Sequence, residues 1–274
     1  MNVELISGKG GVGKSVVTAA KARIAARSGK RVLALSMLPG GGLGAHLGLD
    51  EVQALPTVGV DGVSVAEIRR PDALEQYLRL NSPIPIVVGL GKAVTFFDAL
   101  ATTAPGVREI ITIGKVIHEA ESGQWDAVVV DCAPTGQFAS YLNAPDTISQ
   151  LVPSGRIRKQ ADKIRDFLTD HARITYVSLP EELPVVETLA AIAEEVPGEL
   201  NPVIFNRLLS PLSVPVPSGE SALARAAQLQ NAIVRQQAHW IAQLPNSLYL
   251  PFLLGASGPM EVSDLLTGVL EAAT

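Results

Sequence analysis

The sequence has few of the residues on which several classes of protein depend. Its 274 residues contain one cysteine, Cys132, which excludes an intramolecular disulfide and a zinc site built from several cysteines of one chain. Charged residues make up only 18% of the chain and the net charge is −5, so the clustered cations of a nucleic-acid-binding surface are missing. We expect no nucleic-acid partner and a reducing, cytoplasmic location.

Long hydrophobic runs and a secretory signal are also missing. The N-terminal MNVELISGKGG has no basic segment followed by a long apolar one. The most apolar stretch, Ser82 to Val107, is interrupted by Pro83, Pro85, Lys92 and Asp98, so we expect no transmembrane segment and interpret it as a core or partner-facing helix. The chain does contain 47% hydrophobic residues, enough for a sizeable core.

The order of predicted elements is that of an α/β protein. A strand at Val3–Ile6, a glycine-rich loop, a helix at Lys14–Arg27 and a strand at Arg31–Leu35 form a β-α-β unit, which favours a parallel sheet. Later strands are predicted at Val63–Ile68, Ala127–Val130, Ile174–Ser178, Val203–Phe205 and Ser247–Leu250, and helices at Pro71–Leu80, Pro184–Glu195 and Ala222–Gln243.

We expect residues 1–274 to form a single domain, in which 81–120 and 138–170 are candidate elements of a small helical subdomain. Apolar residues lie near one face of the last predicted helix, which predicts a surface packed against the sheet: Leu223, Ala226, Leu229, Ile233, Trp240 and Ile241.

The glycine-rich loop carries the most specific chemistry. Gly8 to Ser15 reads G-x-x-x-x-G-K-S, follows a strand and opens a helix, which is the context of a phosphate-binding P-loop. Backbone N–H groups would hold phosphate oxygens, Lys14 would reach the β- and γ-phosphates, and the Ser15 hydroxyl would bind Mg²⁺. The predicted loop contacts to ATP or ADP are Gly8, Lys9, Gly10, Gly11, Val12, Gly13, Lys14, Ser15 and Val16.

A second lysine, Lys9, follows the first glycine of this loop. The pattern K-G-G-x-G-K-S resembles the deviant Walker A loop of the P-loop NTPase superfamily that contains MinD, ParA, the nitrogenase iron protein and the arsenite-pump ATPases. The resemblance implies a mostly parallel twisted sheet with helices on both faces, and a dimer in which Lys9 reaches the nucleotide of the other subunit. A solvated loop charge is the alternative for Lys9.

Asp131 ends the apolar run Ala127–Val130, where an acid can hold Mg²⁺ through water. The segment Asp131 to Gln137, D-C-A-P-T-G-Q, resembles the D-T-A-P-T-G-H motif of the family of arsenite-pump and tail-anchored-protein targeting ATPases. The resemblance implies catalytic roles for Lys9, Lys14 and Asp131, and further nucleotide contacts from Pro134, Thr135, Gly136, Asn206, Arg207, Pro251 and Phe252. A turn role for Asn206 and a core role for Phe252 remain alternatives.

Ser36 to Gly48 lines up with the switch I segment of that family, S-T-D-P-A-H-N-L-S-D-A-F-G, but Leu38 and Ala45 replace its two aspartates. In the family the first aspartate orients the attacking water, which a leucine cannot do. We therefore expect ATP to be bound well and hydrolysed slowly, or only with a partner. His46 and Asp50 are candidate replacements, although each is also typical of a loop or a helix end.

The resemblance implies a homodimer, or a heterodimer with a paralogous ATPase, and an unidentified protein client. The chain lacks the Met-rich insert and the C-x-x-C clasp of eukaryotic targeting members, and Cys132 alone argues against metalloid binding. The apolar segment Ile84–Leu100 is the candidate client surface. A positioning ATPase like MinD or ParA and a non-hydrolysing regulatory subunit are the alternatives, although the acidic residues from Asp264 to Thr274 argue against a basic membrane or DNA contact.

Overall fold

The computed structural model describes residues 2–81, 106–194, 196–213 and 221–273, and the candidate client surface at Ile84–Leu100 lies outside them. The strands are β1 (Asn2–Ser7), β2 (Val32–Ser36), β3 (Thr57–Val58), β4 (Ser64–Glu67), β5 (Ala127–Asp131), β6 (Ala172–Ser178), β7 (Glu199–Leu200), β8 (Ile204–Leu208) and β9 (Leu248–Pro251). The helices are α1 (Lys14–Arg27), α2 (Leu43–His46), α3 (Arg70–Asn81), α5 (Val107–Glu121), α6 (Thr135–Leu151), α7 (Arg156–His171), α8 (Glu182–Ala193), α9 (Ala222–Ile241) and α10 (Pro259–Ala273).

These strands form one sheet in the order β3-β4-β2-β5-β1-β6-β8-β9, with β7 beside β6. Every described pairing is parallel except that of β3 with β4. The register places Asp131 opposite Ile6 and Ser36, and Ser36 opposite Glu67. The carboxyl ends of β1, β2, β4 and β5 therefore lie at one edge, where parallel α/β sheets place their ligands.

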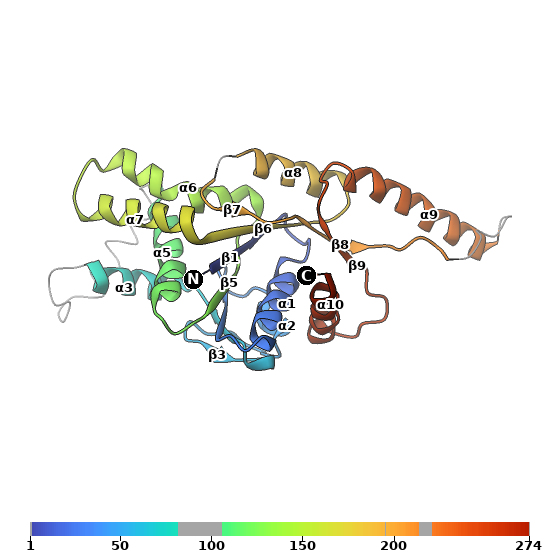
Figure 1. The fold of residues 1–274 in the computed structure, drawn as a ribbon, viewed down its shortest axis with the longest axis horizontal. Coiled ribbons are helices and arrows are strands. Elements are labelled where there is room, and N and C mark those ends of the chain that lie inside the picture. Colours follow the sequence, from blue (N-terminus) through green and yellow to red (C-terminus); the bar gives the residue numbers. More distant parts are fainter. Residues whose placement is uncertain (1, 82–105, 195, 214–220, 274) are drawn as a thin grey trace.

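Helices cover both faces of this sheet (Figure 1). Alternate residues of one strand enter different cores: Leu5 packs with the core under α5, α6, α7 and α8, whereas Ile6 packs with the core under α1, α2 and α10. Val128 and Val129 divide in the same way on β5. Burial on both faces explains why these strands are continuous apolar runs, and it confirms the predicted α/β fold of a single domain.

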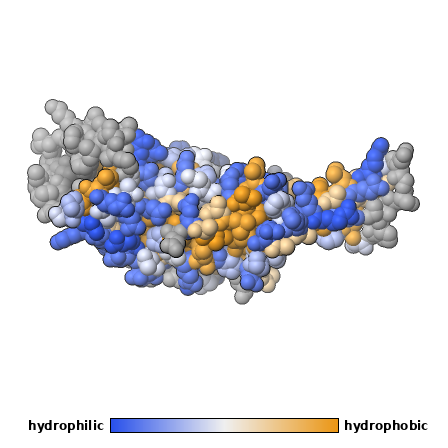
Figure 2. Space-filling model, turned by 90° about the horizontal axis from the view of Figure 1, so that it is seen from above, coloured by the Kyte–Doolittle hydropathy of each residue, from blue (hydrophilic) through white to orange (hydrophobic). Residues whose placement is uncertain are grey.

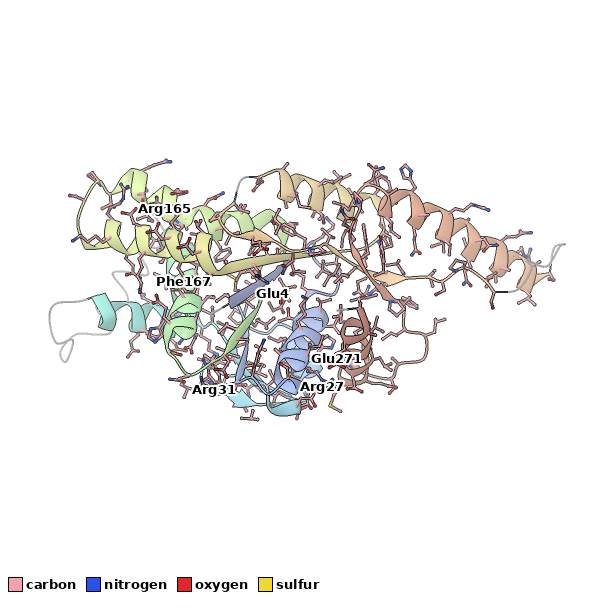
Figure 3. All side chains as sticks on the ribbon, in the orientation of Figure 1. Glu4, Arg27, Arg31, Arg165, Phe167 and Glu271 are labelled. Atoms are coloured by element: carbon pink, nitrogen blue, oxygen red, sulfur yellow. The ribbon has the colours of Figure 1, made fainter. Side chains whose placement is uncertain are left out.

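Helix α1, which begins at the P-loop, is joined to α10 by ion pairs as well as by packing. Arg23 of α1 is 5% exposed and its guanidinium donates to Asp61, Ser263 and Asp264. One turn further along, Arg27 approaches Glu271 of α10 at 3.5 Å, and Figure 3 shows these two side chains between the helices. This network fixes α10 against the helix that begins at the P-loop.

Most predicted elements coincide with observed ones to within a few residues. α1 covers the predicted Lys14–Arg27, and Gly29 follows it with a φ of 85°, as expected for a glycine that ends a helix. Helices α5, α6 and α7 occupy most of the described parts of 81–120 and 138–170, while their separation as a subdomain stays a prediction. No helix within the described ranges is both long and apolar enough to cross a bilayer.

The prediction for α9 was wrong. Leu223 and Leu229 are 71% and 63% exposed, whereas Trp240 and Ile241, at the end of the helix, pack against the core. Figure 1 shows the reason: α9 extends away from the sheet, so only its C-terminal end reaches the body of the molecule. An apolar stripe defines a face of a helix, but it does not determine whether that face is covered.

Candidate functional site

The loop Gly8–Gly13 is held in a conformation that only glycine tolerates at two points. Gly8 has a φ of 151°, and a Cβ there would lie 2.1 Å from the Val177 carbonyl oxygen. Gly13 has a φ of 100°, and a Cβ there would lie 2.3 Å from the amide nitrogen of Asn206. The loop is therefore packed between β6 and β8, and its shape is fixed by the surrounding chain.

The start of α1 meets the end of β5 directly. The Ser15 hydroxyl donates to the Asp131 carboxylate at 2.6 Å, and the Lys14 ammonium donates to the Lys9 carbonyl at 3.2 Å. Burial lowers the pKa of Lys14 against the opposing effect of Asp131, and burial raises the pKa of Asp131 against the hydrogen bond from Ser15. Both charges are thus short of solvation, which an anion beside Lys14 and a cation beside Asp131 would relieve.

Ser15 and Asp131 fit a magnesium ion chemically, because both offer the oxygen ligands that Mg²⁺ prefers. Two protein oxygens are few for a complete metal site, and Mg²⁺ characteristically completes its ligands with water and substrate phosphate. Within the described residues, no group of three or more His, Cys, Asp and Glu side chains could hold a metal ion alone. A magnesium ion here would therefore depend on the phosphates that Lys14 and the loop bind.

Glu187 joins the P-loop to the segment after β5. This carboxylate of α8 accepts from the Lys9 ammonium and, at 3.3 Å, from the Thr135 hydroxyl. The Thr135 amide also donates to the Gly8 carbonyl at 3.3 Å. Pro134, Thr135 and Gly136 thus lie at the N-terminus of α6 against the loop, where a helix favours an anion.

The position of Glu187 at the P-loop is not predicted from the sequence. A usable signal was present, since Glu187 interrupts the apolar run of α8, but its distance of 178 residues from Lys9 hides the pairing. In this structure Lys9 is therefore engaged within its own chain.

A cavity of about 380 Å³ opens beside the P-loop and brings together distant predicted residues. It is lined by Gly13, Val16, His46, Asn206, Arg207, Pro251, Phe252, Leu253, Pro259, Val262 and Leu266. Its largely apolar walls and its position next to the phosphate loop suit the base and sugar of a nucleotide. The residues predicted to contact the base therefore line the same cavity as Gly13 and Val16 of the predicted phosphate side.

Asn206 lies 3% exposed at this wall, where its side-chain amide donates to the Val12 carbonyl at 2.9 Å. Its side-chain oxygen accepts from the amide of Arg207, whose φ is 60°. Asn206 thus ties β8 to the P-loop, and contact with a base stays a prediction. His46 also lines the cavity, with its Nδ1 2.8 Å from the Pro259 carbonyl oxygen, whereas Asp50 is exposed.

Switch I lies on the same edge of the sheet and is held differently. The Ser36 hydroxyl donates to the Leu38 carbonyl at 2.8 Å, and the Leu38 side chain packs against the core under α5 and α6. Gly40 donates its amide to Glu67 at 3.0 Å, while a Cβ at Gly40 or Gly42 would have nothing within 4 Å. Residue 38 therefore presents an aliphatic side chain to the core.

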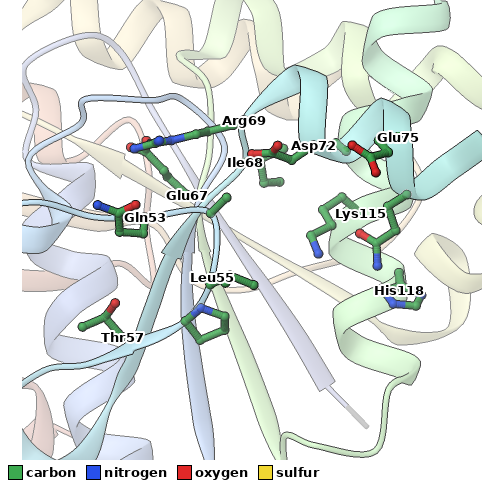
Figure 4. A pocket seen from close by; sticks show the side chains of 14 residues that line it. Gln53, Leu55, Thr57, Glu67, Ile68, Arg69, Asp72, Glu75, Lys115 and His118 are labelled. Carbon is green, nitrogen blue, oxygen red and sulfur yellow. The ribbon is translucent and has the colours of Figure 1, made fainter. Parts of the chain in front are cut away.

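Glu67 is the second functional candidate that the sequence analysis missed. It is a carboxylate 7% exposed at the end of β4, which is the signal that identified Asp131 at the end of β5. Arg69 donates to it at 2.8 Å, and the pair forms one wall of a cavity of about 850 Å³ between the loop at 53–57, α3 and α5 (Figure 4). The residues that line this larger cavity include none from the P-loop or from switch I.

Cys132 follows Asp131 and is buried, with its amide donating to the Ile6 carbonyl at 2.9 Å. Burial raises the pKa of its thiol well above the ordinary value, and the neighbouring charge of Asp131 adds to this effect. The thiol is therefore protonated at neutral pH, which makes it a poor ligand for a soft metal or metalloid.

Comparisons with known proteins agree with this geometry. The sequence model of the anion-transporting ATPase family matches residues 1–196, a stretch that contains the P-loop, Asp131 and Glu187. The chain is 30% identical over 248 residues to the ATPase BagA of Mycobacterium tuberculosis, covering 83% of this chain and 70% of that one. It is 25% identical over 257 residues to an ATPase ASNA1 homolog of Entamoeba dispar, covering 85% of this chain and 75% of that one.

A third relative is the ATPase get3 of Pyrenophora tritici-repentis, which is 26% identical over 204 residues, or 72% of this chain and 58% of the relative. The match to the family model, over residues 1–196, extends beyond the P-loop and includes switch I and α6. The chain belongs to the family of anion-transporting ATPases, which includes the arsenite-pump and targeting ATPases.

Proposed function

We propose that this chain is a nucleotide switch that binds Mg-ATP in the P-loop, works as a dimer and hydrolyses ATP slowly or only with a partner. The observation that carries the proposal is the joining of two half-sites at Gly13. Phosphate-side groups, Lys14, Ser15 and Asp131, lie on one side of this glycine, and the cavity of about 380 Å³ lies on the other.

The chain's own residues divide the work of binding. Loop amides and the Lys14 ammonium hold phosphate oxygens, and Ser15 and Asp131 supply oxygens to the metal ion. Bound Mg²⁺ would neutralise the charge that develops on the phosphate oxygens as the terminal phosphoryl group is transferred. The walls around Asn206 and Phe252 exclude water from the base.

Switch I supports slow hydrolysis. An attacking water needs a group that orients it, and Leu38 provides a side chain that packs against the core. The nearby buried carboxylate, Glu67, is engaged with the Gly40 amide and with Arg69. A low rate is therefore expected although the phosphate loop is intact.

Lys9 supports a switch that acts through a second subunit. Its pairing with Glu187 neutralises it within one chain, and release from Glu187 would free its ammonium for a phosphate elsewhere. The same release would leave Thr135, at the start of α6, as the described partner of Glu187. The release of Lys9 would therefore be linked to a change in the contacts at the start of α6. We include in this proposal a protein client and a cytoplasmic location, which the single, buried Cys132 favours.

The test combines affinity with turnover. The purified chain is expected to bind ATP with Mg²⁺ in the micromolar range or tighter, measured by calorimetry, while its steady-state rate lies far below that of a relative with both switch I aspartates. Failure to bind ATP would refute the proposal at its base. A rate equal to that of the intact relative would refute the slow-hydrolysis part alone.

Leu38→Asp is the sharpest variant of this test. Restoring a water-orienting carboxylate is expected to raise the turnover rate about 100-fold, since such groups contribute about 10²–10⁴ to rates. Leu38→Asn, which has the same shape and no charge, is the matched control and should leave the rate low. Equal rates for the two variants would show that another group limits hydrolysis.

A further inference from the structure

The outward face of α8 is unusual for the surface of a folded chain. Pro184, Val185 and Thr188 are buried against the molecule, yet Leu183, Val186 and Leu189 on the other side are 64%, 51% and 37% exposed. Seen from above, hydrophobic residues gather in the middle of the molecule, where Figure 1 places α8 (Figure 2). A contiguous apolar patch of this kind marks a surface that another molecule covers.

The arm formed by α9 shows the complementary property. Of its 20 residues, Ala224, Ala227 and Gln237 are buried, while Leu223 and Leu229 are largely exposed. A helix in a protein is ordinarily stabilised by packing of its apolar face, and in the first half of α9 the buried side chains are small while the large apolar ones face solvent. The arm extends from the same side of the molecule on which α8 lies (Figure 1).

Charge distinguishes the two helices. α8 and its two cap residues, Glu181 and Glu194, contain four acids and no basic residue; the other two acids are Glu182 and Glu187. α9 contains Arg225, Arg235 and His239 and no acidic residue. The two exposed surfaces are therefore each apolar, and they carry charges of opposite sign.

We propose that α8 of one copy packs on α9 of a second copy of this chain, and that a two-fold axis repeats the contact. In such an isologous interface each surface of one subunit meets the other surface of its partner, so a single pair of complementary faces is used twice. The acidic α8 disfavours an anionic membrane or a nucleic acid as the occupant, whereas the basic α9 of another copy fits it.

This inference names the surface of the dimer in the proposed function, and so rests on it for the existence of a dimer. It also gives the contact a consequence for the site. Glu187 lies on α8 directly after the exposed Val186 and holds Lys9, so a partner on α8 would meet the residue that holds Lys9. Self-association and the release of Lys9 would then involve the same helix.

Two charge-reversal variants of the full chain test the contact. One carries Glu182→Lys and Glu194→Lys on and beside α8, and the other carries Arg225→Glu and Arg235→Glu on α9; all four side chains belong to exposed residues. Sedimentation velocity, with and without Mg-ATP, should show self-association of each variant weakened about tenfold or more, because each reversal removes the attraction between opposite charges at both copies of the contact.

Mixing the two variants in equal amounts should restore the dimer, since both contacts of the mixed pair again join opposite charges. Glu51→Lys with Asp72→Lys is the matched control, because these exposed residues lie before β3 and near the start of α3, which Figure 1 draws away from α8 and α9. The control should associate like the wild-type chain. Circular dichroism checks that each variant is folded.

Three results would overturn the inference: a wild-type chain that is monomeric in both conditions, reversal variants that associate as strongly as the wild type, or a mixture that stays monomeric. Nucleotide affinity is measured separately with a fluorescent ADP. A wild-type chain that does not bind the nucleotide would refute the proposed function. A wild-type chain that binds the nucleotide and forms a dimer unaffected by the charge reversals would refute the inference alone.

Discussion

The P-loop and switch I leave the same edge of the same sheet, but they are built in opposite ways. Around the P-loop, Val177 and Asn206 leave no room for a Cβ, and Thr135 and Asn206 bond to its backbone. Switch I has three glycines in succession, and a Cβ would meet no atom within 4 Å at two of them, Gly40 and Gly42. The comparison teaches that a tightly packed glycine loop can lie at the same edge of a sheet as a loop whose glycines have open space around them.

The largest expected effect concerns the P-loop, the tightly packed half of this comparison. Lys14→Ala removes a partly buried ammonium that the phosphates need as a counter-charge. Affinity for Mg-ATP should fall about 100-fold, equivalent to ~3 kcal/mol for a hydrogen bond to a charged group, as measured by calorimetry. Lys30→Ala, at an exposed position after α1, is the control and should bind like the wild type. Unchanged affinity in Lys14→Ala would remove the phosphate role from this loop.

Asp131→Asn would sharpen the comparison by separating stability from function. Burial raises the pKa of Asp131 in the folded chain above the unfolded value of 3.8, so folding favours the protonated carboxyl. The stability that this carboxyl contributes is therefore fully present below pH 3.8 and is lost as the pH rises through the folded-state pKa. At pH 7 the variant without nucleotide should therefore have a Tm at or above that of the wild type, with the advantage shrinking towards pH 4. The increase in Tm that Mg-ATP gives the wild type should be reduced, because a ligand that binds the folded chain stabilises it by mass action.

Asp126, just before the same strand, is the control of opposite sign. A hydrogen bond from Arg31 lowers the pKa of Asp126 to about 2, so its contribution is present above the unfolded value and is lost as the pH falls towards 2. Asp126→Asn should lower the Tm slightly at pH 7 and leave the effect of Mg-ATP intact. If Asp131→Asn keeps the full Mg-ATP effect, Asp131 has no part in holding the metal ion.

The smallest effect concerns switch I. Glu67→Gln weakens a charge-assisted bond to the Gly40 amide while keeping an acceptor there. A loss of about 1 kcal/mol should increase hydrogen exchange at Gly40 about fivefold, with little change in ATP affinity. Glu51→Gln is the matched control, since Glu51 approaches the same Arg69 only at 3.8 Å. Equal exchange in both variants would show that Glu67 does not anchor switch I.

The sequence predicted the sheet and the glycine-dependent shape of the P-loop because both depend on local patterns. Apolar runs bounded by glycines specify parallel strands, and the loop from Gly8 to Ser15 contains its own geometric requirements. That Leu38 replaces a family aspartate remains a prediction, and only the structure shows that its side chain packs against the core. The nucleotide contacts predicted for individual residues remain predictions.

The sequence could not predict interactions that depend on the relation between distant elements. Glu187 meets Lys9, and Glu67 meets Gly40, because the sheet order brings their elements together at one edge. The exposure of Leu223 was missed for a related reason, since the direction in which α9 leaves the body is not encoded in its periodicity. Burial of a face depends on what lies opposite, and an isolated helix pattern contains no such information.

The bridging position of Glu187 implies a cost for any event that takes Lys9 away. Lys9 must give up a partner that it already has, so its interaction with a second subunit competes with the ion pair to Glu187. The fold holds this carboxylate beside Lys9, which gives it a fixed effective concentration. Only chains in which Lys9 is free can make this contact, so the apparent affinity between subunits is reduced in proportion to the fraction of such chains. A weak encounter without nucleotide, and a tighter one when phosphate charge offers Lys9 a better counterion, would follow from this one carboxylate.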